Sequence, residues 1–232
     1  MAEQLSLGVS LRDDATFENF FVGQGNALVV HALRQFSQSE GDQNLVLWGS
    51  NGSGLSHLLQ ACCHAAHQEH HVIQYLPLAS MIDYSPKDVC EGLDRLPLLC
   101  LDGIEAICGN YAWEQAIFHL FNRLRDAGNR LLMASHTSPA QLALVLPDLQ
   151  SRLLGSVVYH LHPLDDEEKG KALQLRAKKR GMDMSEDVCR YILSRAPRDT
   201  SKLFALLNTL DAATLQHQRK LTIPFIKEVM AY

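Results

Sequence analysis

The stretch "GSNGSGLSH" at residues 49–57 has the spacing of a loop that binds phosphate. Glycines at this spacing expose backbone N–H groups to phosphate oxygens at the start of a helix, and a serine hydroxyl can reach a magnesium ion. A structural glycine turn is the alternative that the spacing also allows. As a phosphate loop, its expected nucleotide contacts are Gly49, Asn51, Gly52, Ser53, Gly54, Leu55, Ser56 and His57.

Leu55 occupies the position where such loops normally carry lysine. The missing ammonium group would face the β- and γ-phosphates. A cation about 4 Å from a phosphate near the surface is worth roughly 4 kcal/mol before desolvation. We therefore expect this loop to hold a nucleotide more weakly and to support a γ-phosphate poorly.

Asp102 ends the apolar run "LPLLCLD", where a Walker B carboxylate would orient magnesium or its waters. An aspartate that caps the following turn is the alternative. ATPases that hydrolyse their own ATP usually place a second acid beside the first, but Gly103 stands there and Glu105 comes two residues later. The expected magnesium ligands are Ser56 and Asp102.

Arg152 ends the short amphipathic segment "LPDLQSR". It is either an ordinary surface cation or a finger that stabilises charge on a phosphoryl group held by a neighbouring molecule. Upstream, "RLLMASH" ends in Ser135 and His136, at the place of a γ-phosphate sensor, although a helix cap explains the serine equally well.

These residues need a framework of strands and helices. Short β-rich runs alternate with helical patterns, which predicts an α/β fold with a parallel sheet and helices on both faces. The five runs are "LVLWG" (45–49), "VIQYLPL" (72–78), "LLCLD" (98–102), "RLLMAS" (130–135) and "VVYHLHPL" (157–164). After Pro163 only helical patterns follow, which predicts a small all-helical second domain.

Composition places the chain among folded globular proteins, with 232 residues of which 47% are hydrophobic. No apolar stretch approaches the roughly 18 residues of a membrane span, and the N-terminus lacks the features of an export signal. The six cysteines show no paired spacing. We expect a cytoplasmic protein with no membrane contact.

The net charge of −5 argues against a chain that coats nucleic acid by itself. DNA contact is therefore expected mainly through a partner. The basic cluster "RAKKRG" at 176–181 reads as a solvated helix end. The alternative is a DNA-binding module that uses this cluster with Arg195 and Arg198.

Two further groups of residues suggest chemistry that we do not expect. The histidines His64, His67, His70 and His71 have helical spacing beside Cys62 and Cys63, yet no closed set of metal ligands is evident. None of the cysteines has a neighbour that would activate it as a nucleophile.

The N-terminal "QLSL" is a frayed end by default. As a peptide motif, Gln4 would contact backbone while Leu5 and Leu7 fill pockets of a partner's groove. So few residues do not decide between these interpretations.

The combined segments resemble the Hda family, AAA+ relatives of the bacterial replication initiator DnaA. The resemblance covers nearly the whole chain and rests on "QLSL", "SLRDDATFENFFVG", "LWGSNGSGLSHLL", "LLCLDGIE", "WEQAIFHLFNRL", "LPDLQSRL", "LQLRA" and "QRKLTIPFIKEV". It implies an AAA+ domain with a five-stranded parallel sheet and a helical lid. The expected parts are a flexible clamp-binding segment (1–16), the AAA+ nucleotide-binding domain (17–163) and the lid (164–232).

The resemblance also implies a function. Such a protein binds the sliding clamp, the β subunit of DNA polymerase III, through Gln4, Leu5 and Leu7, although Gly8 stands where the family often has proline. On clamp-loaded DNA it promotes hydrolysis of the ATP held by DnaA. Its own loop holds a nucleoside diphosphate, typically ADP. A bound magnesium ion and a homo-oligomer are left open.

Residue by residue, the resemblance makes Arg152 the arginine finger and Asp102 the Walker B acid. The stretch 17–23 matches the part that wraps the nucleotide base, which adds Phe20 and Val22. The sensor arginine of the lid falls near Ser201, with Lys202 one place away.

The leading hypothesis is thus a negative regulator of replication initiation that supplies Arg152 in trans and needs no ATPase activity of its own. The alternative is a self-sufficient AAA+ ATPase that acts as a helicase loader or DNA-bound remodeller.

Overall fold

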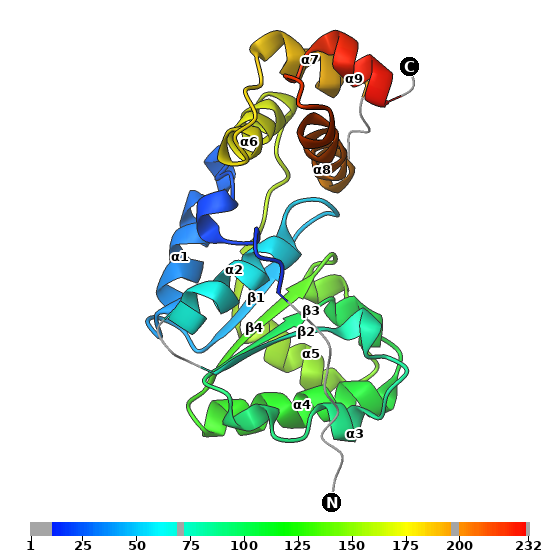
Figure 1. Cartoon of the computed structure of the whole chain (residues 1–232). Helices are drawn as coiled ribbons and strands as arrows, with labels where there is room; N and C mark the ends of the chain where they lie inside the picture. The colour runs from blue at the N-terminus through cyan, green and yellow to red at the C-terminus, as the bar shows by residue number, and fades with distance from the viewer. Residues whose placement is uncertain (1–10, 69–71, 196–199, 231–232) are drawn as a thin grey trace, which may run out of the picture.

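The computed structural model describes residues 11–68, 72–195 and 200–230, apart from the side chain of Ser201. Figure 1 shows a sheet between layers of helices, with the C-terminal helices standing over one end of that sheet. The clamp residues Gln4, Leu5 and Leu7 lie outside the described residues. Their role therefore stays a prediction.

The sheet has five strands in the spatial order β2-β3-β4-β1-β5. They are β1 (Asn44–Trp48), β2 (Ile73–Pro77), β3 (Leu98–Asp102), β4 (Arg130–Ser135) and β5 (Val157–His160). Every neighbouring pair is parallel. Parallel strands covered on both faces read as continuous apolar runs, which is why the sequence reveals them. The predicted five-stranded parallel sheet is confirmed.

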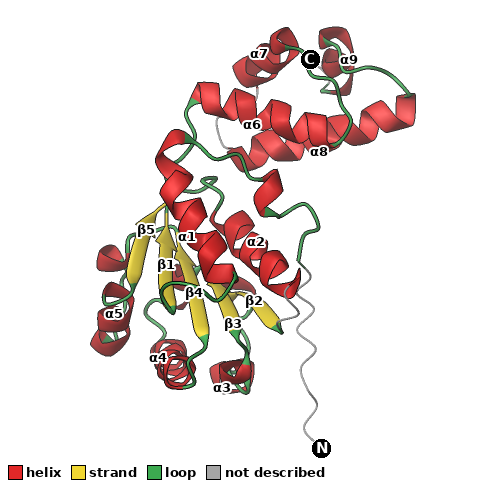
Figure 2. Ribbon diagram, turned by 90° about the vertical axis from the view of Figure 1, so that its left-hand side faces the viewer, coloured by secondary structure: helices red, strands yellow, loops and turns green. Residues whose placement is uncertain are grey.

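Different helices cover the two faces of the sheet (Figure 2). Residues of β3 alternate between them: Leu98 and Cys100 pack with the helices of one face, Leu99 and Leu101 with those of the other. The first face carries α1 (Ala27–Ser37) and α2 (Leu55–Gln68); the second carries α3 (Pro86–Val89), α4 (Tyr111–Asp126) and α5 (Pro147–Leu154).

Short 3-10 turns connect these elements. They are η1 (Phe17–Asn19), η2 (Gln24–Asn26), η3 (Leu78–Ser80), η4 (Leu93–Arg95), η5 (Ile104–Ile107) and η6 (Pro139–Gln141). Among the described residues, no helix is long and apolar enough to cross a lipid bilayer.

The C-terminal part is all helical, as predicted. It contains α6 (Asp166–Lys179), α7 (Glu186–Arg195), α8 (Thr200–His217) and α9 (Ile223–Val229). A capping box starts α6, because the side chains of Asp165 and Glu168 each accept the backbone N–H of the other residue. These helices bury a separate apolar core, which includes Leu173, Ile192 and Phe225. We refer to this part as the lid.

A buried carboxylate fixes the approach to α5. Glu114 on α4 is 0% exposed, and it accepts the backbone N–H groups of Gly109, Val145 and Leu146 at 2.8, 2.9 and 2.7 Å. The last two residues directly precede α5, which begins at Pro147. Since α5 carries Arg152, Glu114 sets where that arginine lies.

We expect Glu114→Ala to lower the free energy of unfolding by about 3 kcal/mol, because three N–H donors lose their carboxylate acceptor and the buried side chain leaves a cavity. Urea denaturation measures this loss. The matched control is Gln115→Ala on the exposed side of the same helix, which should stay within about 0.5 kcal/mol of wild type. Equal stability of the two variants would contradict the structural role of Glu114.

Candidate functional site

The glycine loop joins β1 to α2 in a conformation that requires its glycines. Gly52 and Gly54 have φ values of 79° and 105°, which side chains rarely tolerate. A Cβ on Gly49 would lie 2.5 Å from the carbonyl oxygen of Leu161. The first N–H groups of α2 have no partners within the helix, so the loop can present donors to phosphate.

A cavity of about 620 Å³ opens at this loop, between the sheet and the lid. Its walls come from the N-terminal segment, the loop, the end of β4 and the lid helices α6 and α8. The predicted nucleotide contacts that line it are Phe20, Asn51, Gly52, Ser53, Gly54, Leu55, Ser56 and His57.

Leu55 contributes to the cavity wall, yet its side chain belongs to the core. It is 2% exposed and packs in the apolar cluster beneath α1 and α2. Phe20 lies directly over the loop, since a Cβ on Gly54 would come 2.7 Å from its ring. The place of the usual lysine is therefore taken by a buried aliphatic side chain.

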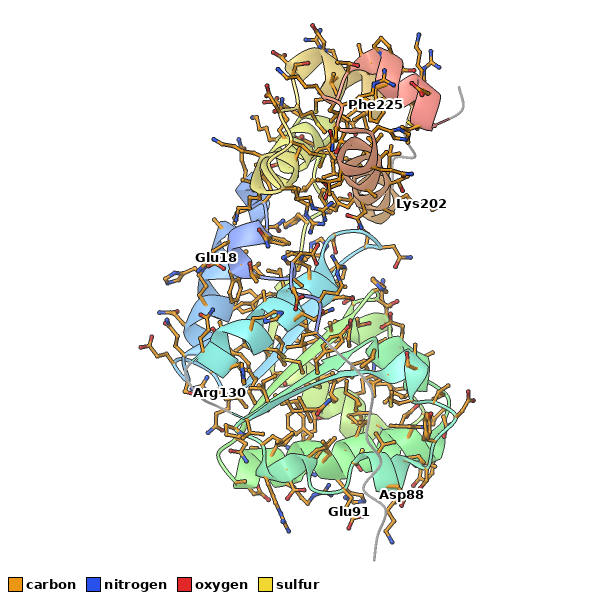
Figure 3. The ribbon with its side chains drawn as sticks, viewed as in Figure 1. Glu18, Asp88, Glu91, Arg130, Lys202 and Phe225 are labelled. Atoms are coloured by element: carbon orange, nitrogen blue, oxygen red, sulfur yellow. The ribbon has the colours of Figure 1, made fainter. Side chains whose placement is uncertain are left out.

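The other predicted contacts lie outside the cavity lining. Gly49 is buried beneath the loop, and Val22 is 41% exposed. Lys202 is exposed on α8 (Figure 3), whereas that helix faces the cavity with Thr200, Phe204, Ala205 and Asn208.

Asp102 lies at the carboxyl end of β3, where a tyrosine engages it. The Tyr75 hydroxyl donates to Asp102 Oδ2 at 2.5 Å, and Ser56 and Gln60 lie near the same hydroxyl. Burial and the neighbouring carboxylate raise the pKa of Tyr75, which keeps its proton. Tyr75 thus positions the Asp102 carboxylate close to Ser56, and sequence reasoning missed it.

These residues fit a magnesium site of the usual kind. Magnesium in nucleotide sites takes one or two protein oxygens and completes its shell with waters and phosphates. Asp102 keeps a second carboxylate oxygen, Oδ1, for which no hydrogen bond is formed among the described residues.

The acid nearest to Asp102 in sequence is engaged elsewhere. Gly103 adopts a left-handed conformation with φ 81°, and the carboxylate of Glu105 accepts the N–H of His136 at 3.3 Å. His136 lines the cavity and contacts the Gly49 carbonyl at 3.3 Å through Nδ1. Ser135 is buried and accepts the N–H of Thr137. The strand end therefore shows a turn cap rather than a free sensor.

A buried polar chain connects the loop helix with the lid. His57 Nε2 donates to the carbonyl oxygen of Thr16 at 2.8 Å, and Arg176 on α6 donates to His57 Nδ1 at 3.0 Å. Arginine can only donate, so the proton of the neutral imidazole must reside on Nε2. Burial lowers the pKa of His57 to about 4. Arg176 is a cavity residue that sequence reasoning assigned to a solvated helix end.

Arg152 lies away from this cavity. It is half-buried on α5, on the sheet face opposite α1 and α2, and its guanidinium lies 5.8 Å from the centre of the Phe118 ring on α4. Leu149 and Leu153 on the same helix are fully buried and hold it in place. Arg152 is not among the residues that line the cavity.

Two family models match consecutive parts of the chain. The model of the bacterial DnaA ATPase domain covers residues 11–160, and that of the Hda lid domain covers residues 166–230. The chain belongs to the Hda-type, DnaA-related AAA+ family.

Solved structures share the fold of this DnaA-related chain. Domain III of DnaA from Thermotoga maritima is 22% identical with a TM-score of 0.82, over 96% of this chain and 98% of that one. AMPPCP-bound DnaA from Aquifex aeolicus is 23% identical with a TM-score of 0.76, over 89% and 68%. The Holliday junction branch migration motor RuvB from Thermotoga maritima is 16% identical with a TM-score of 0.67, over 91% and 70%. The predicted AAA+ fold is confirmed.

In this member of the DnaA-related family, the basic cluster at 176–181 is used inside the molecule. Lys179 donates to the carbonyl oxygen of Glu18, which Figure 3 places between α1 and the lid. Arg180 lies 3.6 Å from Asp14 and 3.9 Å from Asp211. These cations tie the N-terminal segment to the lid, which leaves the alternative of a DNA-binding patch with little support.

The histidine and cysteine groups lie only partly within the described residues. Among the described residues, no group of three or more histidine, cysteine, aspartate or glutamate side chains could hold a metal ion. His64 contacts the Arg12 carbonyl at 2.9 Å, while His70 and His71 lie outside the described residues. Burial raises the pKa of the Cys62 thiol, so this cysteine is a core residue.

The neutral His57 predicts a pH dependence of stability. A histidine with a pKa of about 4 in the folded protein and 6.5 when unfolded stabilises fully above pH 6.5, and this contribution is lost as the pH falls toward 4. Between pH 7 and pH 5, wild type should therefore lose about 2 kcal/mol more unfolding free energy than His57→Gln.

Urea denaturation of both proteins at the two pH values measures the difference. Glutamine keeps one donor and one acceptor but does not titrate, so the charges of Arg176, Arg12 and Asp14 around it stay the same. Parallel pH profiles of the two proteins would show that His57 is not held neutral.

Proposed function

We propose that this DnaA-related protein is a negative regulator of replication initiation that stimulates hydrolysis of the ATP bound by DnaA, with Arg152 inserted into the DnaA site. The position of Arg152 is the observation that supports this proposal most directly. It is fixed on α5 by two buried leucines, it stands beside Phe118, and it takes no part in the cavity of its own chain. A guanidinium in this position is available to contact a partner molecule.

The chemistry expected of Arg152 follows from its charge and shape. During hydrolysis, negative charge spreads over the oxygens of the transferred phosphoryl group. A planar guanidinium with five N–H donors can bind two of these oxygens at once. Because α5 and the Glu114 turn fix the position of Arg152 before DnaA binds, little ordering is required when the site closes.

The chain's own cavity supports a regulatory nucleotide rather than a substrate. We propose that it holds a nucleoside diphosphate, with ADP as the expected ligand, against the loop 51–57. AMPPCP bound to DnaA of the same fold favours nucleotide in this position. Ser56 and Asp102 would hold magnesium, which would neutralise phosphate charge when bound. Leu55 and Gly103 leave a γ-phosphate without its lysine and its second acid.

We further propose that Gln4, Leu5 and Leu7 dock on the sliding clamp of DNA polymerase III, so that DNA is reached mainly through the clamp and the protein works in the cytoplasm at the nucleoid. The segment that follows the motif is anchored to the protein. The Arg12 N–H donates to Gln60 Oε1 at 2.9 Å, and the His64 ring bonds the Arg12 carbonyl. A clamp-bound motif would thereby hold the whole domain.

We expect Arg152→Ala to reduce the stimulated turnover of DnaA-bound ATP by about 1,000-fold or more in the presence of clamp-loaded DNA, because an arginine finger stabilises the transition state by that order. Arg152→Lys keeps the positive charge but lacks the planar guanidinium, so its stimulated turnover should lie between those of wild type and Arg152→Ala. Phosphate release from DnaA preloaded with labelled ATP measures turnover.

Arg125→Ala is the matched control, since this exposed arginine on α4 pairs only with its neighbour Asp126 among the described residues. It should retain wild-type stimulation. Turnover equal to wild type in Arg152→Ala would exclude the finger. The same assay without DnaA tests the alternative activity: ATP hydrolysis by this chain alone, abolished by Asp102→Asn, would favour a self-sufficient ATPase.

Replacement of both Gln4 and Leu5 by alanine should abolish co-migration with the sliding clamp in gel filtration, because the motif loses its polar contact and one apolar anchor. Ser6→Ala, between the proposed anchors, is the control and should co-migrate as wild type does. Undiminished co-migration of the double variant would show that the N-terminal motif is incidental.

A further inference from the structure

Arg176 sits in an unusual environment for an arginine. Its guanidinium lies 3.8 Å from the centre of the Phe204 ring and donates to the neutral His57 at 3.0 Å. Burial lowers its pKa to about 10. The aromatic ring and the imidazole fix the plane of the guanidinium, yet neither neutralises its charge.

The carboxylate whose charge acts on Arg176, that of Asp14, is already engaged. Asp14 forms a two-pronged pair with Arg12 at 2.9 and 3.1 Å and lies 3.6 Å from Arg180. Among the described residues, no carboxylate lies within the 4.0 Å of an ion pair with Arg176. A partly buried cation of this kind is stabilised by an anion that binds beside it.

The cavity supplies the place for that anion. Arg176 lines the same cavity as the glycine loop 51–57. The other arginine of the lining, Arg12, is neutralised by Asp14, and Lys202 is not part of the lining. Among the described arginines and lysines that line this cavity, Arg176 is thus the one without a paired carboxylate.

We propose that Arg176 is the phosphate-binding cation of this site, supplied by lid helix α6 in place of a lysine in the loop. This inference rests on the proposed nucleotide binding. It identifies the residue that supplies the positive charge for the bound phosphate. The loop lies on the sheet domain and Arg176 lies on the lid, so a phosphate bound by both connects the two parts. Binding therefore depends on the charge of the ligand and orders the lid.

Titration calorimetry with ADP and with adenosine tests the proposal. Arg176→Gln should weaken ADP binding by about 30-fold while it changes adenosine binding less than about 2-fold, because only the phosphates meet the guanidinium. Arg176→Lys should recover much of the ADP affinity. Lys178→Gln, an exposed cation on the same helix, should bind both ligands as wild type does.

A second measurement needs no variant. In wild type, ADP should slow amide hydrogen exchange in α6, and adenosine at equal occupancy should not. The role of Arg176 would be overturned if Arg176→Gln bound ADP as tightly as wild type or lost as much affinity for adenosine as for ADP. It would also be overturned if both ligands slowed hydrogen exchange in α6 equally. None of these results would affect the proposed function. A wild-type protein that binds no ADP would instead refute the proposed nucleotide site itself.

Discussion

A partly buried chain of hydrogen bonds, from the Thr16 carbonyl through His57 to Arg176, connects the lid with the sheet domain at the cavity. It joins three parts that are far apart in sequence: the segment before α1, the first turn of the loop helix and α6 of the lid. Because His57 is neutral and carries its proton on Nε2, each link has a defined direction. This chain therefore joins cavity walls that come from the sheet domain and from the lid.

Separate supports hold the two functional regions. The cavity lies at the carboxyl ends of the strands, which point toward the lid (Figure 2). Arg152 depends instead on α4, α5 and the buried Glu114 beneath the other face. A substitution in the cavity can therefore change the cavity without disturbing Arg152. This separation agrees with the proposed function, in which the protein keeps its own nucleotide while the nucleotide of DnaA is hydrolysed.

The sequence was informative wherever a feature is local. Buried parallel strands produce apolar runs, a glycine loop needs glycine at left-handed positions such as Gly52, and Asp102 follows its strand directly. Residues that act through distant partners could not be found this way. Tyr75 became relevant only when register brought β2 beside β3.

Arg176 and Glu114 show the same limit. In sequence, Arg176 is the first of a run of cations at a helix end, and its meaning comes from His57, 119 residues earlier. Glu114 has the pattern of an acid in a helix's first turn, yet it accepts N–H groups from a turn some thirty residues later. No local pattern in the sequence predicts either contact.

The burial of Leu55 has an evolutionary consequence. Its side chain is 2% exposed among the apolar residues beneath α1 and α2, so the position now contributes to the stability of the whole sheet domain. A lysine introduced there would need to leave the core or bury an unpaired ammonium group, and both are costly. The leucine is therefore constrained: introducing the usual loop cation would require compensating changes in the neighbouring core, and a single exchange would lose stability first.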